Sequence, residues 1–386
     1  MGRHQQGYIF RKGANWYGRW WDDVIVEGQT VRKQRCEKLA EVSDRYRSKA
    51  DVRPLLAEKL RPINERKVKA ESTLPVAQFV EGYYLPFAEA NCRPSTYSAY
   101  KTQWATYLAP RLTKIILRDF RTVDAANLLA DIHRSHGLGR STLRHLKAFM
   151  STVFTFAKNQ GVLDGVNPIQ DAMIPRKAAA PEETHATTPD EVLLMMNALE
   201  KAGERKASCA VGLMFFAGLR PGEARGVRWQ DFDGKRLNVR QSIWRTHATE
   251  PKTAESCNPV PIIDPLRSLL GEIRIADGNP EAGPILRSPL GKPLNLDNLA
   301  KRKVRPILAA AGLDWHGWYA LRRGIATLVN AVEKDAMAAK GLLRHASVTT
   351  TQKHYIKEVP EITQKAMEKV ETLCTNRANT ETSKPS

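Results

Sequence analysis

The feature that most constrains the fold of this 386-residue chain is a set of reactive side chains spread along its C-terminal half. Arg220 and Arg322 each follow a leucine, and His345 precedes Tyr355 by ten residues across a Thr-rich stretch. The sequence has no internal repeat that would bring these groups together locally. A fold that uses them jointly must therefore bring distant stretches of chain to one place.

Two guanidinium groups, an imidazole and a phenol are suited to attack on a phosphodiester. Such a reaction needs a nucleophile, positive charge on the nonbridging oxygens, a proton for the leaving oxygen and in-line alignment. A nuclease that uses two metal ions would instead show clustered Asp and Glu residues. The sequence shows no such cluster, so catalysis by cationic side chains is the better interpretation.

The composition favours a polyanionic partner. Sixty Lys and Arg residues against 41 Asp and Glu residues give a net charge of +19, and the isoelectric point is about 9.8. Such an excess predicts binding through phosphate neutralisation that weakens as salt rises. Charge alone would suit a ribosomal or RNA-binding protein equally well, so the motifs must decide.

Length and residue usage set further bounds. A hydrophobic content of 42% and this length predict a globular protein of two or three domains. We expect no membrane span, because no apolar run approaches 18 residues, and no secretory signal at the N-terminus. The five scattered cysteines form no CxxC pair, which fits a reducing compartment and argues against a disulfide framework or zinc site.

The first 70 residues predict a small basic domain. Residues 7–12 and 15–21 read as two short aromatic strands with turns at 13–15 and 27–29, followed by a helix over about 43–60. Residues 3–69 carry a local net charge of +8, and Arg11 and Arg19 alternate with the aromatic side chains. These aromatics either support nucleic-acid binding or merely fill the core of a basic mini-domain. Residues 61–73 read as a linker.

Residues 74–177 show helical periodicity. One helix is predicted from Pro94 towards Tyr107, since proline suits a first helical turn. A later helix carries the apolar stripe Leu143, Leu146, Phe149, Met150, Val153 and Phe156, which we interpret as core. Only three cations on the polar side of that helix are candidate phosphate contacts: Arg140, Arg144 and Lys147.

A second linker over 174–181 precedes the last domain, which opens with a capping box from Thr188 to Glu191. Arg220 stands at a predicted helix–helix junction, between Gly218 and a helix starting at Pro221. Glu223 lies three residues on and is positioned to orient Arg220 by a charged hydrogen bond. In isolation, this motif would read as a surface arginine beside a structural glutamate.

Taken in order and spacing, Gly218-Leu219-Arg220, Ala320-Leu321-Arg322 and the stretch from Leu343 through His345 to Tyr355 closely resemble the tyrosine recombinase (phage integrase) family. The resemblance covers residues 70–372 well and residues 1–70 more loosely. It implies a multidomain, mainly α fold. Its parts would be a small β-sheet arm-binding domain with linker (1–70), a helical core-binding domain (71–177), an α+β catalytic domain (184–373) and a disordered tail (374–386).

The resemblance also implies roles for individual residues. Arg220 and Arg322 would be the two catalytic arginines, His345 a hydrogen-bond donor to the phosphate and Tyr355 the nucleophile. Lys252 resembles the β-hairpin lysine that protonates the departing 5′ oxygen, although a lysine in such a loop is usually just solvated. Lys235, in an Asp-Gly turn, is the competing lysine.

Two positions depart from the family pattern. Tyr319 stands where a histidine is usual, three residues before Arg322 and therefore on the same helix face. A phenol donates a hydrogen bond but, with a pKa of about 10, accepts a proton poorly near neutral pH. This departure leaves the general base open, with His316 the weaker substitute. Arg344 replaces the glycine before His345, and we expect it to face DNA and to add a phosphate contact.

The implied function is site-specific DNA recombination through a covalent 3′-phosphotyrosine intermediate and a Holliday junction, integrating or excising a phage or mobile element. We expect a homotetramer on double-stranded DNA attachment sites in the bacterial cytoplasm, associated with the nucleoid. Accessory partners would be an excisionase or DNA-bending proteins, and neither a metal ion nor another cofactor should be required. A helix over 362–373 would pack on its own domain or on a neighbouring protomer. The alternatives are a type IB topoisomerase-like nicking and rejoining enzyme and a catalytically inactive DNA-binding protein.

Overall fold

The computed structural model describes residues 4–65, 69–251 and 254–355. The chain divides into two compact units, one up to Glu182 and one from Glu183 onward. Helices dominate the described residues, and the strands there form one three-stranded and two two-stranded sheets. The expectation of a mainly α protein with small sheets is confirmed. None of the described helices is long and apolar enough to cross a membrane.

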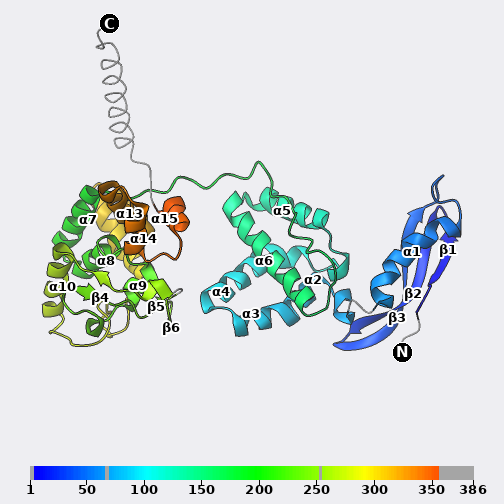
Figure 1. Cartoon of the computed structure of the whole chain (residues 1–386), viewed down its shortest axis with the longest axis horizontal. Coiled ribbons are helices and arrows are strands. Elements are labelled where there is room, and N and C mark those ends of the chain that lie inside the picture. Colours follow the sequence, from blue (N-terminus) through cyan, green and yellow to red (C-terminus); the bar gives the residue numbers. More distant parts are fainter. Residues whose placement is uncertain (1–3, 66–68, 252–253, 356–386) are drawn as a thin grey trace, which may run out of the picture. The chain divides into compact units, whose positions relative to one another are not determined.

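The N-terminal residues form an antiparallel sheet with one helix against it (Figure 1). The elements are β1 (Tyr8–Lys12), β2 (Asn15–Val26), β3 (Gln29–Glu41) and α1 (Lys49–Asn64). Ile9, Trp16 and Trp20 are buried at alternating strand positions and pack with Leu56 and Leu60 of α1. The side chains of Trp16 and Trp20 therefore form a core, which is the second of the two roles considered for these aromatic residues in the sequence analysis.

Helix α1 corrects the predicted boundaries. It begins at Lys49 because Ser48 and Asp51 form a capping box. It runs past position 61, where a linker was expected, because Leu60 is buried and Asn64 exchanges two hydrogen bonds with the backbone of Gln5 (3.0 and 2.9 Å). The charged residues after Leu60 thus continue a helix whose last turn is held by the N-terminal segment.

The helical part of the first unit surrounds α6 (Figure 1). Its α-helices are α2 (Val76–Phe79), α3 (Leu85–Asn91), α4 (Pro94–Gln103), α5 (Thr122–His136) and α6 (Arg140–Asn159). Short 3-10 turns span Ala70–Thr73, Ala109–Arg111 and Leu117–Asp119, and π-turns span Val80–Tyr84 and Trp104–Leu108. The predicted stripe on α6 is core: Leu143, Leu146, Phe149 and Val153 are fully buried, while Phe156 is partly buried.

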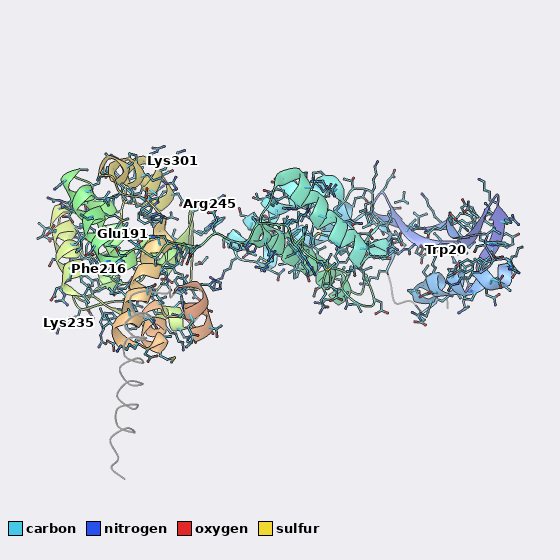
Figure 2. All side chains as sticks on the ribbon, turned by 90° about the horizontal axis from the view of Figure 1, so that it is seen from above. Trp20, Glu191, Phe216, Lys235, Arg245 and Lys301 are labelled. Carbon is cyan, nitrogen blue, oxygen red and sulfur yellow. The ribbon has the colours of Figure 1, made fainter. Side chains whose placement is uncertain are left out.

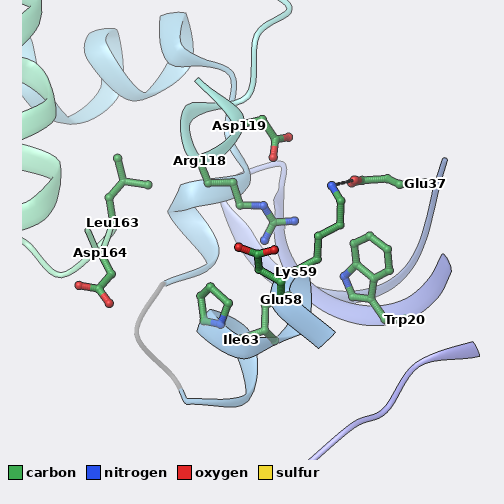
Figure 3. Close-up of a pocket in the computed structure, with 10 residues that line it drawn as sticks. Trp20, Glu37, Glu58, Lys59, Ile63, Arg118, Asp119, Leu163 and Asp164 are labelled. Carbon is green, nitrogen blue, oxygen red and sulfur yellow. Dashed lines mark hydrogen bonds and ion pairs between the residues drawn. The ribbon is translucent and has the colours of Figure 1, made fainter. Parts of the chain in front are cut away.

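Ion pairs join the sheet to the helical part within this unit. Arg118 donates a hydrogen bond to the buried carboxylate of Asp22 on β2, and Arg35 lies 3.9 Å from the same carboxylate. Lys59 of α1 pairs with Glu37 of β3 at 2.8 Å, beside a pocket that Trp20 and Arg118 also line (Figure 3). The sheet is therefore tied to the helices by charge as well as by packing.

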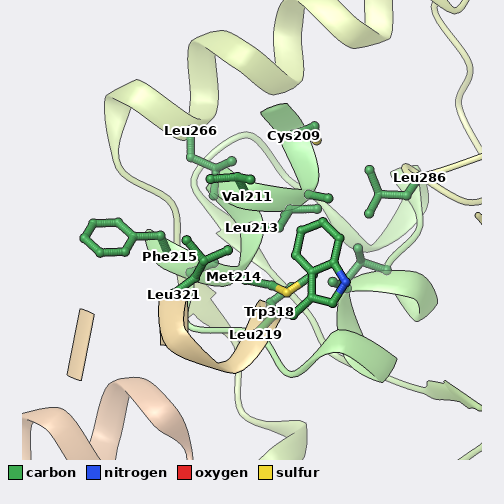
Figure 4. Close-up of a cluster of buried hydrophobic side chains, with 14 of the residues drawn as sticks. Cys209, Val211, Leu213, Met214, Phe215, Leu219, Leu266, Leu286, Trp318 and Leu321 are labelled. Atoms are coloured by element: carbon green, nitrogen blue, oxygen red, sulfur yellow. The ribbon is translucent and has the colours of Figure 1, made fainter. Parts of the chain in front are cut away.

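The C-terminal unit is built around α8 (Arg205–Phe215), from which Ala207 to Phe215 are buried without interruption (Figure 4). The other α-helices are α7 (Pro189–Lys201), α9 (Pro221–Gly226), α10 (Asp264–Ala276), α11 (Leu296–Leu299), α12 (Arg305–Ala310), α13 (Trp318–Glu333), α14 (Ala336–Leu343) and α15 (Val348–His354). Trp229–Asp231 and Ala254–Cys257 form 3-10 turns, and Ala300–Val304 forms a π-turn. The predicted capping box of Thr188 and Glu191 is confirmed at the start of α7.

The described residues of this unit also form two short antiparallel strand pairs. β4 (Arg236–Leu237) pairs with β7 (Val260–Pro261), and β5 (Ser242–Trp244) pairs with β6 (His247–Thr249). Trp318 and Leu321 of α13 join the core beside α8 (Figure 4). Because α13 is fixed at its buried face, the side chains of its first two turns have defined positions.

Gly324 allows α13 to approach the segment before α7. A Cβ at this position would overlap the carbonyl oxygen of Thr187 and lie 2.9 Å from Phe215 Cε2. We expect Gly324→Ala to destabilise the C-terminal unit by about 1–3 kcal/mol, because backbone atoms cannot yield as a side chain can. Calorimetry of the full chain measures the shift.

Gly271, in the interior of α10, is the matched control. No atom lies within 4 Å of a Cβ added there. Gly271→Ala should be neutral or stabilise by up to about 1 kcal/mol, since alanine favours a helix. Equal melting behaviour of the two variants would contradict the close contact at Gly324.

Candidate active site

Arg322 joins three separate segments at the centre of the C-terminal unit. It is fully buried on the second turn of α13. One terminal nitrogen donates to the carbonyl oxygen of Gly218, and the other donates to the carbonyl oxygen of Leu343 at 2.6 Å and to His345 Nε2 at 2.9 Å. The convergence that the sequence analysis required is therefore present around this guanidinium.

Arg322 remains positively charged in this environment. Burial, and then the charge of nearby Arg220, lower the pKa of Arg322 to about 10. That value still lies well above neutral pH, so a buried cation sits at the site. Its Nε atom is buried without a hydrogen-bond partner among the described residues. A buried N–H of this kind favours an added acceptor such as an anion.

Arg220 caps the N-terminus of α9, where the chain turns after α8. Gly218 takes a left-handed φ of 56° and Pro221 opens α9, as the sequence predicts for this junction. Glu223 Oε1 accepts a hydrogen bond from the Arg220 guanidinium at 2.6 Å, and its Oε2 accepts from the Arg220 backbone N–H at 2.9 Å. Arg220 also donates to Ser256 Oγ at 3.3 Å. Glu223 therefore orients Arg220 through both carboxylate oxygens.

Arg344 does not face outward, so the expected orientation of this residue is wrong. The residue is 2% exposed, and its guanidinium donates to Glu223 Oε2 at 2.6 Å. The physical reason is the buried carboxylate of Glu223, which requires cationic partners in the protein interior. The site thus contains three arginines around one carboxylate, where the sequence analysis expected two.

His345 is held as a neutral imidazole. Its Nε2 lies 2.9 Å from an Arg322 N–H and must accept, so Nδ1 carries the proton and donates to Thr351 Oγ1 at 2.8 Å. Burial, followed by the charges of Arg322 and Arg220, lowers the pKa of His345 to about 3. The predicted role as a phosphate donor requires a proton on Nε2, which the bond to Arg322 excludes in the free protein.

Two phenols lie against this cluster. The ring of Tyr355 is centred 4.6 Å from that of His345 and 5.3 Å from the Arg322 guanidinium carbon. Its carbonyl oxygen accepts a hydrogen bond from Thr327 Oγ1 at 3.2 Å. Tyr319 is 47% exposed, one helical turn before Arg322. Burial and then Tyr355 raise the pKa of Tyr319, so its hydroxyl group keeps its proton near neutral pH.

The other candidates for chemistry are placed differently. Lys252 lies outside the described residues. Lys235 is exposed in the turn before β4, at the edge of the C-terminal unit (Figure 2). The ring of His316 lies 4.0 Å from that of His185, which contacts Glu191, and has no recorded contact with the arginine cluster among the described residues.

Sequence reasoning missed several contributors to the site, and three of them hold the Arg322–His345 pair. The hydroxyl group of Thr351 fixes the tautomer of His345, and the carbonyl oxygens of Gly218 and Leu343 hold Arg322. Main-chain acceptors leave no signal in a sequence. Thr351 gave only the weak signal of lying in the Thr-rich stretch between His345 and Tyr355.

Some of the residues predicted to contact DNA outside this cluster are exposed, and others donate hydrogen bonds to the protein backbone. Arg140 donates to the carbonyl oxygen of Arg176 at 2.9 Å, and Lys147 donates to those of Gln170 and Ala172 at 2.9 and 2.7 Å. Arg144 is exposed on the same helix.

On the sheet, both predicted arginines are exposed. Arg11 donates to the carbonyl oxygen of Gly13 at 3.0 Å, and the Arg19 guanidinium lies 5.0 Å from the Phe10 ring centre. Among the residues placed in the structure, no three His, Cys, Asp or Glu side chains group as metal ligands would.

Comparisons with known sequences identify related proteins. Residues 185–361 match the phage integrase family. A protein of Caldanaerobacter subterraneus subsp. tengcongensis described as tyrosine recombinase XerC-like is 25% identical over 313 residues, covering 73% of this chain and 78% of that protein. A tyrosine recombinase XerC of a Methylobacterium species is 26% identical over 287 residues, covering 68% and 83%.

Solved structures share the fold. The Tn1549 transposon integrase in complex with transposon right end DNA aligns with a TM-score of 0.63 at 16% identity, covering 77% of this chain and all of that one. A lambda integrase tetramer bound to a Holliday junction aligns with a TM-score of 0.56 at 18% identity, covering 92% of this chain and 95% of that one.

The neutral state of His345 has a consequence for acid stability. Unfolded histidine takes up a proton below about pH 6.5, whereas the folded site resists protonation until about pH 3. Stability is therefore lost as pH falls through this window, by up to about 1.4 kcal/mol per pH unit. Urea unfolding at pH 7, 6 and 5 should show a shallower pH dependence for His345→Gln than for the wild type. Equal slopes, or an NMR shift of the His345 ring nitrogens between pH 8 and 5, would contradict the neutral imidazole.

Proposed function

We propose that the chain is a member of the tyrosine recombinase (phage integrase) family, which its residues 185–361 match, and that it recombines DNA at specific sites with Tyr355 as the nucleophile. The observation that carries the proposal is that a single buried guanidinium, Arg322, contacts both His345 and the ring of Tyr355. A phenol, a fixed cation and a second arginine at one place are what metal-free attack on a phosphate requires.

In the proposed reaction the Tyr355 oxygen attacks the scissile phosphorus. A bond forms between this oxygen and the 3′ phosphate, the bond from phosphorus to the 5′ oxygen breaks, and the phenolic proton passes to solvent. Arg322, 5.3 Å from the ring centre, stabilises the phenolate that forms. The phosphotyrosine bond keeps the energy of the phosphodiester, so rejoining needs no ATP.

Arg220 and Arg322 would stabilise the charge that develops on the nonbridging oxygens. Glu223 fixes Arg220, and backbone carbonyl groups fix Arg322, so neither guanidinium has to reorganise during the reaction. Removing one such donor typically costs about 10²–10³ in rate. Tyr319 would assist as a hydrogen-bond donor, because its raised pKa keeps the phenol protonated.

Lys252 is proposed as the acid that protonates the leaving 5′ oxygen. Support comes from the described residues on either side. Thr249 ends β6, and Ser256 accepts a hydrogen bond from Arg220. Lys252 lies three residues after Thr249 and four before Ser256 in the sequence, so it belongs to the segment that leads from β6 to a residue in contact with Arg220.

We further propose a division of labour along the chain. Residues 1–70 would bind arm-type DNA through Arg11 and Arg19, residues 71–177 would bind the core site through Arg144, and residues 184–373 would carry catalysis. The net charge of +19 and the DNA complexes of the structural neighbours support double-stranded attachment sites as the partner. The Holliday-junction tetramer of lambda integrase supports a homotetramer, and the Tn1549 transposon integrase supports a phage or mobile element as the context.

The nucleophile is tested with a nicked suicide duplex carrying the attachment site. Wild-type protein should form a covalent adduct that survives a denaturing gel, and Tyr355→Phe should form none, because only the phenol oxygen can make the bond. Tyr83→Phe, which removes a hydroxyl from a partly exposed tyrosine of the first unit, should behave as the wild type. Adducts on any DNA sequence would indicate a topoisomerase-like enzyme, and no wild-type adduct would indicate a DNA-binding protein without catalysis.

The acid is tested by changing the leaving group. Lys252→Ala should reduce cleavage about 10²-fold or more on ordinary DNA. A substrate with sulfur in place of the 5′ bridging oxygen should recover most of that loss, because a thiolate departs without a proton. Lys235→Ala is the matched control and should cleave both substrates normally. An equal loss on both substrates would remove Lys252 from the role of acid.

A further inference from the structure

Arg344 occupies a position that suits glycine. It ends α14 with φ 53° and ψ 51°, in the left-handed region where a Cβ is strained. Lys334 has the same φ of 53° at the end of α13, but its side chain is exposed. Arg344 therefore combines a strained backbone with a buried charge, and both are unfavourable for folding. The hydrogen bond and ion pair of its side chain with Glu223 offset this unfavourable free energy.

Those interactions centre on Glu223. The carboxylate receives Arg220 at 2.6 Å on one oxygen and Arg344 at 2.6 Å on the other, while Arg322 lies 4.0 Å away. Burial acts to raise the pKa of Glu223, but the charges of Arg344, Arg322 and Arg220, in that order, overcome it, so the pKa lies below its usual value. Glu223 is thus ionised, and Arg344 is its strongest neutralising partner.

The buried cluster also has unused donors. Arg344 Nε, one terminal nitrogen of Arg344 and Arg322 Nε are buried with no hydrogen-bond partner among the residues that the structure describes. Leaving such donors unpaired is unfavourable, most of all on a charged group. An anion that enters beside them would supply the missing acceptors.

A charge count separates the role of Arg344 from that of the other arginines. Three guanidinium groups oppose one carboxylate, and His345 is neutral, so the cluster carries a net charge of about +2. Without Arg344 the net charge would be about +1, because Glu223 would cancel Arg220. A phosphodiester carries one negative charge, and its pentavalent transition state carries two.

We propose that Arg344 is a positioning residue that neutralises Glu223, so that the carboxylate orienting Arg220 does not oppose the doubly negative transition state. The inference rests on the proposed function and adds a third arginine to its chemistry. Arg344 acts through Glu223 from a buried position, so it should affect the chemical step and leave DNA affinity unchanged.

The first test compares variants of Arg344 in single-turnover cleavage of the suicide duplex. Arg344→Gly should relieve the backbone but lower the adduct-forming rate by about tenfold to a hundredfold. Arg344→Met, which keeps the side-chain volume and loses the charge, should show the same loss, and Arg344→Lys should retain most of the rate. Lys334→Gly relieves the same backbone strain at an exposed residue and should cleave at the wild-type rate. A wild-type rate for Arg344→Gly, or a changed DNA affinity that accounts for its loss, overturns the proposal.

A substrate with a neutral methylphosphonate at the scissile position separates charge balance from structure. Its transition state carries one negative charge fewer, so the deficit of Arg344→Gly should shrink at least severalfold on this DNA. A purely structural defect would slow both substrates by the same factor. Equal deficits therefore overturn the proposal.

Failure of the proposed function would be visible separately, as a wild-type protein that forms no adduct on either substrate. The charge role of Arg344 is then read from anion binding by the full chain. Sulfate carries two negative charges, as the transition state does and a phosphodiester does not. Sodium sulfate should therefore raise the melting temperature of the wild type and of Lys334→Gly more than that of Arg344→Gly, with sodium chloride at equal ionic strength as the reference. Equal shifts for all three proteins would overturn the role of Arg344 as well.

Discussion

The burial of the Arg322 guanidinium is the interaction on which the rest of the site depends. A charge without access to water is tolerated only when its hydrogen bonds are made inside the protein. Gly218, Leu343 and His345 supply acceptors here, each from a different segment. The end of α8, the end of α14 and the turn before α15 are therefore held in register by one side chain. The geometry of the candidate site and the tertiary structure of this unit therefore depend on the same hydrogen bonds.

Much of this architecture could be predicted from local chemistry. The capping box at Thr188 and the glycine–proline junction around Arg220 are signals of a few residues, and both appear where expected. The apolar stripe of α6 was equally readable, because burial imposes helical periodicity. The end of α1 was not readable, because Asn64 is held by the backbone of Gln5, a contact between distant residues.

The site itself could be predicted by residue type but not by orientation. Arg220, Arg322, His345 and Tyr355 meet as their chemistry suggested. Arg344 was expected to face DNA and to contact a phosphate, yet its side chain points inward to the buried Glu223 carboxylate. The protonation state of His345 could not be predicted from the sequence either. The Arg322 guanidinium can only donate, so His345 Nε2 accepts from it, and the Thr351 hydroxyl group then accepts from Nδ1.

Two of the acceptors around Arg322 belong to the main chain, at Gly218 and Leu343. Carbonyl groups near the C-terminal ends of helices carry partial negative charge, which complements a cation. Exchanging the side chain at 343 leaves its carbonyl group where it was, as long as the helix end keeps its path. The position of Arg322 therefore depends on the path of the chain at these two places and not on which side chains occupy them.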